Sequence, residues 1–340
     1  MSSRLTRLSV YSLAHFLVDF CCALLVFRIV DTFFDAALLY LCYNYCAFAL
    51  QMPIGLLADK LNRNAIVAAL GCGLVVLGFA LHALPLAAVI AAGVGNACFH
   101  VGGGIDTLND GGNKAASLGV YVSPGAAGLF FGTQLGKGDF PLLYGAVLML
   151  ASAAAILIAA HRTGVLKKSH NAPLSFRGVF AFDAALPALC LFLVVVIRSF
   201  AGMTMSFDWK SMGHWALISM LAVVLGKTAG GFVMDKLGAR VTSLASLILA
   251  AVLFLLPDSP YAGVAAIFLF NITMPITLFA LAKKMPGLKG FSFGLLTFAL
   301  FLGFVPVGLG LCGSSEPWLL CFMCVLSALL MLPGAASIRR

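Results

Sequence analysis

The chain has 340 residues, of which 62% are hydrophobic and only 10% are charged. A water-soluble domain carries about 25% charged residues, so this chain has too little polar surface to cover a globule in water. The sequence therefore predicts a polytopic membrane protein. Its net charge of +9 is scattered over many short segments, which argues against a nucleic-acid partner.

Twelve apolar segments are long enough to cross a membrane, because a spanning helix needs about 20 apolar residues. We expect helices over residues 8–29, 36–58, 64–84, 86–107, 117–136, 140–161, 184–206, 212–234, 240–257, 260–282, 290–311 and 316–334. The first segment is long enough to stay in the membrane, so we expect no cleaved signal peptide. The longest break predicts an N-terminal six-helix bundle over 1–161, a central cytoplasmic loop over 162–183 and a C-terminal six-helix bundle over 184–340.

Basic residues near span ends stay cytoplasmic. With the N-terminus inside, sixteen Lys and Arg residues fall on the cytoplasmic side and three fall outside: Arg28, Lys137 and Lys210. This asymmetry predicts a multi-pass protein of a cell membrane, with a bacterial inner membrane expected and both termini cytoplasmic. Anionic lipid headgroups are the expected partners of the excess positive charge.

The first span contains two ionisable residues, His15 and Asp19, which lie four positions apart and hence on one helical face. Such residues cost on the order of 2.5–3.5 kcal/mol in a span, so they usually face a cavity and carry function. Asp19 could carry a coupling proton, which His15 could share because it titrates near neutrality. The alternatives are a fixed counter-ion role for Asp19 and a packed, hydrogen-bonded histidine.

The turn after the second span recurs after the eighth. "GLLADKLNRN" at 55–64 matches "GFVMDKLGAR" at 231–240, an offset of 176 residues, and the same orientation predicts two bundles related by an axis along the membrane normal. An aspartate there can accept hydrogen bonds from a neighbouring helix N-terminus, and Arg63 can tether that cluster. We therefore predict a cytoplasmic gate, the alternative being a plain polar turn, formed by Gly55, Asp59, Lys60, Arg63, Gly231, Asp235, Lys236 and Arg240.

The fifth span, "GVYVSPGAAGLFFG" at 119–132, places Gly125 and Gly128 next to Pro124. Proline removes a helix hydrogen bond and permits a kink, and glycines let a neighbouring helix pack closely. The pattern predicts a kinked helix, although small-residue faces are common in any bundle.

The seventh span contains Arg198. The repeat offset places Asp19 at position 195 of this span, one turn from Arg198. A guanidinium suits bidentate binding of an anionic substrate group; the alternative is a structural pairing partner. Further polar residues in the spans could line a pocket, and Asn271 with Pro275 predicts a broken helix; the predicted substrate-binding set is Arg198, Asn44, Asn96, His100 and Asn271.

Cys321 and Cys324 have the spacing of a metal or redox motif, but no histidine or second cysteine pair follows them. Cysteine within an apolar span behaves as a small buried hydrophobe. We therefore expect no metal and no cofactor.

The repeated turn resembles the signature loop of the major facilitator superfamily, G-x-x-x-D-[RK]-x-G-[RK]-[RK]. The first copy has Asn62 where the pattern has glycine, a mild change because asparagine tolerates a left-handed backbone, and the second copy keeps Gly238. The resemblance implies the major facilitator fold of two pseudo-symmetric six-helix bundles. The segment around Pro124 is similar to the antiporter signature of this superfamily.

Three short sequence segments are similar to the fosmidomycin-resistance-type branch of this superfamily: "AHFLVD" in span one, "FHVGGG" in span four and "RSFAGM" in span seven. The matching positions are His15, Phe16, Asp19, Phe99, His100, Arg198 and Ser199. This resemblance implies efflux of small drug-like molecules or metabolites in exchange for protons.

Together these features predict a proton-coupled secondary transporter that moves a small organic molecule by alternating access, with export expected. The alternative is an uptake symporter or exchanger for a small organic anion anchored by Arg198. We do not expect an enzyme, because the ionisable residues are scattered and do not form a converging nucleophile or acid–base set. The expected partners are a small-molecule substrate, protons and membrane lipids, and the expected working form is a monomer.

Overall fold

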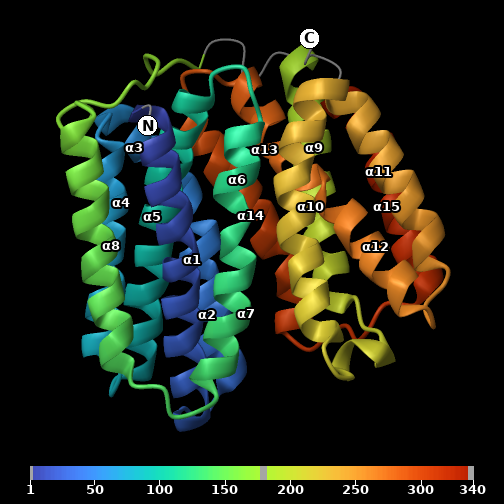
Figure 1. Cartoon of the computed structure of the whole chain (residues 1–340), viewed down its shortest axis with the longest axis horizontal. Coiled ribbons are helices and arrows are strands. Elements are labelled where there is room, and N and C mark those ends of the chain that lie inside the picture. The colour runs from blue at the N-terminus through green and yellow to red at the C-terminus, as the bar shows by residue number, and fades with distance from the viewer. Residues whose placement is uncertain (1–2, 177–181, 336–340) are drawn as a thin grey trace. The chain divides into compact units, whose positions relative to one another are not determined.

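The computed structural model describes residues 3–176 and 182–335 and confirms the predicted all-α polytopic fold. Helices hold 81% of the residues, and the described part contains no strand. The helices of the first half are α1 (Ser3–Ile29), α2 (Ala36–Asn44), α3 (Gln51–Leu61), α4 (Asn64–Ala80), α5 (Pro85–Gly111), α6 (Ala116–Val122), α7 (Pro124–Gly136) and α8 (Leu142–Arg162) (Figure 1).

The second half repeats this pattern of spanning helices joined by short segments. Its helices are α9 (Phe182–Thr204), α10 (Trp215–Leu237), α11 (Ala239–Phe254), α12 (Pro260–Asn271), α13 (Thr273–Lys284), α14 (Lys289–Gly308) and α15 (Pro317–Gly334). Three short turns complete the chain: η1 (Val30–Thr32), the π-helical η2 (Tyr45–Ala49) and η3 (Asp208–Ser211).

Twelve spans result, as predicted. Nine helical segments of the described chain are long and apolar enough to cross a membrane, and α4 and α11 are shorter apolar helices. The twelfth span is the interrupted helix formed by α6 and α7. Part of the predicted central loop, residues 177–181, lies outside the described residues, as do the predicted cytoplasmic charges Arg177, Arg339 and Arg340.

Several spans are interrupted rather than continuous. The second contains the π-helical turn η2 between α2 and α3. The fifth breaks at Ser123, because the next residue, Pro124, has no backbone N–H to continue the helix. The break that the sequence predicts near Asn271 lies between α12 and α13.

Both copies of the repeated turn end their helix with a positive φ, on different residues and with different ψ. Asn62 ends α3 with φ 52°, in the left-handed region, and it is the single non-glycine residue of the described chain with positive φ. Gly238 ends α10 with φ 84°. Asparagine is among the residues that tolerate this region best, so its presence here agrees with the sequence argument.

The chain divides into two compact units. Unit 1 contains Met1–Gly112, Pro124–Ser175 and Gly287–Phe298, and unit 2 contains Asn113–Ser123, Phe176–Pro286 and Ala299–Arg340. Unit 1 thus includes the first half of α14, and unit 2 includes α6. The domain boundaries expected from the sequence, which assign both segments to the opposite halves, stay a prediction.

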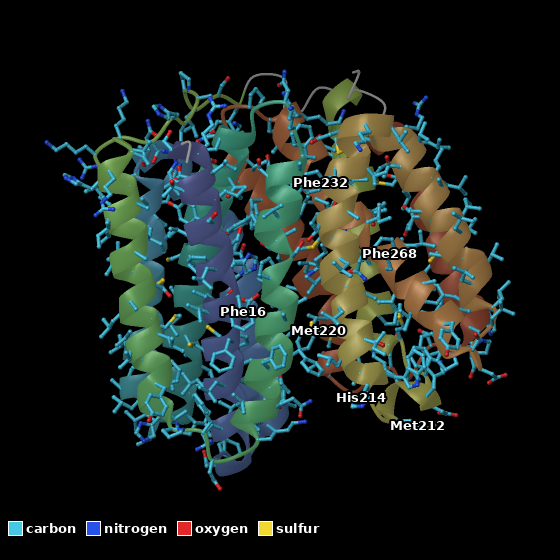
Figure 2. All side chains as sticks on the ribbon, in the orientation of Figure 1. Phe16, Met212, His214, Met220, Phe232 and Phe268 are labelled. Carbon is cyan, nitrogen blue, oxygen red and sulfur yellow. The ribbon has the colours of Figure 1, made fainter. Side chains whose placement is uncertain are left out.

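Within unit 1, α7 packs on α1 through a row of glycines (Figure 1). A Cβ added at Gly128 would collide with the carbonyl oxygen of Phe16, and one added at Gly132 would collide with that of Phe20. Phe16 lies on the stretch of α1 next to α7 (Figure 2). The glycines therefore allow a close backbone approach that a side chain would prevent.

In unit 2, the segment between α14 and α15 is tied back to the end of α9. The backbone N–H of Ser315 donates to the carbonyl of Thr204 at 2.8 Å, and the two hydroxyls are 2.7 Å apart. Cys312 lies three residues before this anchor. It is the exposed cysteine among the ten, all of which are free thiols.

Replacing Gly128 with valine should destabilise the protein, because the new side chain would force α7 away from α1. We expect a lower midpoint of thermal unfolding for the purified protein. The control is Gly73→Ala in α4, where an added Cβ meets open space and helix propensity favours alanine by roughly 0.5–1 kcal/mol. A Gly128→Val variant as stable as Gly73→Ala would contradict the packing argument.

Candidate functional site

Asp59 accepts two hydrogen bonds from the first turn of α14 within unit 1. The backbone N–H groups of Gly290 and Phe291 donate to its two carboxylate oxygens, each at 2.9 Å. Asp59 is 5% exposed, and a helix N-terminus attracts negative charge through its unpaired N–H groups and dipole. Gly55 lies one turn before Asp59, where an added Cβ would collide with the backbone of Gly290.

The second copy makes the same contact within unit 2. The backbone N–H groups of Ala115 and Ala116, at the start of α6, donate to Asp235 at 2.7 and 3.0 Å. An added Cβ at Gly231 would collide with the Ala115 carbonyl. Each copy thus pairs an aspartate and a glycine with the N-terminus of another helix.

The predicted basic members of this motif stand apart from the contact. Lys60, Arg63 and Lys236 are exposed. We expected Arg63 to tether the cluster, but its side chain makes no hydrogen bond or ion pair within the described residues. Arg63 lies at the exposed end of the turn. Arg240 donates to the carbonyl of Leu332 at 3.4 Å.

The tether comes instead from the central loop, which the sequence argument missed. The side-chain amide of Asn171 exchanges hydrogen bonds with Asn64 at 2.7 and 3.1 Å. It also accepts from Asn109 of α5 at 2.9 Å. Asn62 accepts from the Asn171 backbone N–H at 3.2 Å. The central loop is therefore hydrogen-bonded to the turn that follows Asp59 and holds it in place.

Asp19 lies at the middle of a second cluster, called here the Asp19 centre and made of His15, Asp19, Asn96 and His100. His15 Nε2 is 3.3 Å from one carboxylate oxygen, and His100 Nε2 is 3.6 Å from the other. The side-chain amide of Asn96 donates to Asp19 at 3.0 Å. Asn96 and His100, which we predicted as substrate contacts, thus contact Asp19 itself.

The two imidazoles contact each other directly, since their Nε2 atoms are 2.9 Å apart. His100 Nδ1 is 2.9 Å from the carbonyl oxygen of Asn96, so this nitrogen must carry a proton in order to donate. In the neutral ring His100 Nε2 is then an acceptor, and the proton between the rings belongs to His15. The centre can take up a further proton on either the carboxylate or an imidazole.

The possible ligand atoms of this centre also lie close enough together to bind one metal ion. Ligand atoms of His15, Asp19 and His100 lie within 4.8 Å of one another. Two imidazoles bound to one tetrahedral zinc at 2.0–2.1 Å would hold their nitrogens about 3.3 Å apart. The shorter separation of 2.9 Å fits a shared proton better than a shared ion.

Gly125, at the start of α7, touches the Asp19 centre. A Cβ added there would collide with a carboxylate oxygen of Asp19 and with His15 Nε2. The break at Pro124 thus brings the backbone of α7 against the ionisable groups of α1. The sequence argument placed Gly125 in a kink but did not link it to Asp19.

In unit 2, Arg198 is 8% exposed and donates to the hydroxyl of Thr277 at 3.3 Å. Among the described residues no carboxylate lies within ion-pair distance of it. Its helix α9 and its partner's helix α13 belong to spans seven and ten. These correspond to spans one and four, which hold the Asp19 centre in unit 1.

The remaining predicted pocket residues bond to their own helices. The side chain of Asn44 donates to the Tyr40 carbonyl at 2.8 Å, and that of Asn271 donates to the Ile267 carbonyl at 2.8 Å. Both lie at helix interruptions, Asn44 before η2 and Asn271 before α13.

Further polar contacts join α1 to α5 beyond the Asp19 centre, toward the N-terminal end of α1 and the C-terminal end of α5. The Tyr11 hydroxyl donates to Asp106 at 2.7 Å, and Arg7 forms a bidentate ion pair with Asp110 at 2.5 and 2.8 Å. Asp106 had no predicted role. The sequence feature that indicates this row of contacts is the four-residue spacing of polar residues on α1: Arg7, Tyr11, His15 and Asp19.

Comparisons with known proteins agree with this architecture. The structure is similar to a crystal structure of a variant of the E. coli fucose:proton symporter FucP, with a TM-score of 0.71, 14% identity and coverage of 100% of both chains. A second FucP structure, described as a Major Facilitator Superfamily transporter in the outward conformation, gives a TM-score of 0.64 at 14% identity and covers 97% of this chain and 100% of that one. At this identity the likeness shows the fold, which is the predicted major facilitator fold.

No family model matches the chain, and no curated protein matches it.

Removing the Asp59 carboxylate should release the first turn of α14. In Asp59→Ala we expect amide hydrogen exchange at Gly290 and Phe291 to become faster by about tenfold or more, because a hydrogen bond to a charged group contributes about 1.5–3 kcal/mol. Exchange measured by mass spectrometry on peptides from α14 checks this. Peptides from α6 are the internal control, and Asp235→Ala should give the reverse pattern; unchanged α14 exchange in Asp59→Ala would contradict the assignment.

Proposed function

We propose that this protein is a proton-coupled secondary transporter that moves a small organic molecule across the membrane by alternating access. The observation that carries the proposal is the Asp19 centre, a carboxylate held between two imidazoles inside a membrane helix bundle. Ionisable groups are retained at such positions mainly where they serve transport or proton transfer. The fold shared with a protein described as a fucose:proton symporter supports the same class of activity.

The chemistry of the Asp19 centre suits reversible protonation. Histidine changes charge near neutral pH, and the carboxylate changes its preferred state with the hydration and charge around it. Because His15 and His100 share one hydrogen bond, an added proton can be distributed over three groups. We propose that Asp19 and His15 carry the coupling proton, with His100 as the third member.

The two aspartate–helix contacts support the alternating part of the cycle. We propose that the motif residues around Asp59 and Asp235 hold the cytoplasmic gate closed and release it in the inward-open state. Each contact is a pair of hydrogen bonds to one helix N-terminus, so it can break as a unit. The kink residues Pro124, Gly125 and Gly128 supply a break in span five and a close contact with α1.

Export is the direction that the sequence argument favours, through the resemblance to the fosmidomycin-resistance-type branch and the antiporter signature. A second candidate, uptake or exchange of a small organic anion, is favoured by Arg198, which is buried with a hydroxyl as its partner. A guanidinium in such a setting suits a carboxylate or phosphonate group. The symporter description of the structural neighbour also favours uptake.

The described residues do not suggest enzymatic chemistry. Asp19, Asp59, Asp106 and Arg198 are held by imidazoles, backbone N–H groups, hydroxyls or side-chain amides, and we infer that the protein is not an enzyme. We further infer that it works as a single chain in the membrane, with lipids as its surroundings.

Replacing Asp19 with asparagine should abolish substrate-driven proton movement, because the amide cannot take up a proton near neutral pH. Proteoliposomes containing a pH-sensitive dye would be screened with neutral sugars, including fucose, and with small carboxylates and phosphonates. A compound that moves protons in the wild type should not do so in Asp19→Asn. The matched control is Asp258→Asn, an exposed aspartate outside the spans; full coupling in Asp19→Asn would rule out its role as proton carrier.

Arg198→Lys tests the second candidate, because lysine keeps the charge but loses the two-pronged geometry. For an anionic substrate we expect binding about tenfold weaker or more, consistent with the loss of a charge-assisted hydrogen bond. Binding is measured by isothermal titration or by transport KM, with Arg28→Lys as the control substitution. Unchanged affinity for every transported anion would exclude Arg198 as the anchor.

A further inference from the structure

The polar contacts between α1 and α5 fall at four levels along the two helices, and together they are called here the polar seam. Its members are Arg7, Tyr11, His15 and Asp19 on α1, and Asn96, His100, Asp106 and Asp110 on α5. The α1 members are spaced four residues apart, so they lie on one face. The two helices run side by side in Figure 1, and each level is joined by a hydrogen bond or an ion pair.

Asp106 has neighbours of two different kinds. One carboxylate oxygen accepts from the side-chain amide of Asn64 on α4 at 2.7 Å, and the other accepts from the Tyr11 hydroxyl on α1 at 2.7 Å. The amide nitrogen of Asn64 can only donate, whereas a phenol oxygen can both donate and accept. Tyr11 is therefore the neighbour through which Asp106 can exchange a proton.

We propose that Asp106 is a second proton-binding carboxylate, and that Tyr11 passes protons between it and the Asp19 centre. This inference rests on the proposed proton coupling. As Tyr11 gives its own proton to Asp106, its oxygen takes up a proton arriving from His15 by way of bridging water. Tyr11 ends neutral, Asp106 ends as the neutral acid, and Asp106 then returns to the carboxylate by releasing that proton to cytoplasmic water.

The separations along the helices suit such a relay. Along the helix axis, the α1 backbone rises about 6 Å from Tyr11 to His15. The α5 backbone rises about 9 Å from His100 to Asp106. Ser12 on α1 and Thr107 on α5 are buried hydroxyls without a hydrogen-bond partner among the described residues. Buried polar groups of this kind are where proteins hold ordered water, and the relay requires such a water between the His15 level and the Tyr11 level.

The charges around Asp106 decide which carboxylate takes part. Arg7 on α1 is committed to Asp110 by two hydrogen bonds, so Asp110 is fixed as an anion. Asp106 has no cation within ion-pair distance among the described residues, and its neighbours Tyr11 and Asn64 are neutral. A carboxylate whose partners are neutral gains and loses a proton at lower cost than one bound to a guanidinium.

The relay is tested by infrared difference spectroscopy of the full chain in proteoliposomes after a pH jump, a measurement that needs no substrate. Among the pH-dependent carboxylic acid bands of the wild type we expect two from these buried groups, of which Asp19→Asn removes one and Asp106→Asn the other. In Asp106→Asn and in Tyr11→Phe, the rate at which the Asp19 band appears should fall by about tenfold or more. Asp258→Asn and Tyr144→Phe are controls at exposed positions and should leave both bands and rates unchanged.

Two results would overturn the relay: the loss of no band in Asp106→Asn, or an unchanged rate for the Asp19 band in both variants. If Asp106→Asn does not fold, Tyr11→Phe decides the question alone, because it keeps the ring and removes the hydroxyl. A wild type without any pH-dependent Asp19 band would instead contradict the proposed proton coupling, so the two failures are distinguishable.

Discussion

A carboxylate buried among membrane helices must receive hydrogen bonds from protein groups, and this constraint organises the described part of the chain. Asp59 takes backbone N–H groups, Asp106 takes a hydroxyl and an amide, and Asp19 takes an amide and faces two imidazoles. The kind of donor separates their roles. A backbone N–H cannot give up its proton, so Asp59 is suited to holding a helix, whereas imidazoles can exchange protons with Asp19.

The same physical devices appear in both halves of the chain. Asp59 with Gly55 and Asp235 with Gly231 each hold the N-terminus of another helix. The copies differ where other parts of the chain intervene. In the first, Asn62 ends the helix and its side chain also accepts a hydrogen bond from the central loop. In the second copy Gly238 adopts a positive φ of 84° and has no side chain to make such a contact.

The sequence was informative where the signal is local. Span number, the two copies of the turn, the left-handed residue at position 62 and the shared helical face of His15 and Asp19 all follow from periodicity or short motifs. The direct pairing of His15 with His100 does not, because it depends on the relative register of two helices 85 residues apart in the chain.

Contacts made by loops and glycines were the hardest to foresee. Asn171 lies in a polar segment with no periodicity, and its hydrogen bonds reach residues more than 60 positions away. Gly125 reads as part of a kink, and its contact with Asp19 and His15 depends on how α7 packs on α1. Arg63 shows the reverse, since a motif position expected to bind lies in solvent.

The exposure of Cys312 has a practical consequence. It is the exposed cysteine of the ten, three others being partly exposed, and Ser315, three residues later, ties the same segment to the end of α9. A maleimide fluorophore or spin label should therefore react there selectively in the unmodified chain. Its signal would report on a fixed point of unit 2.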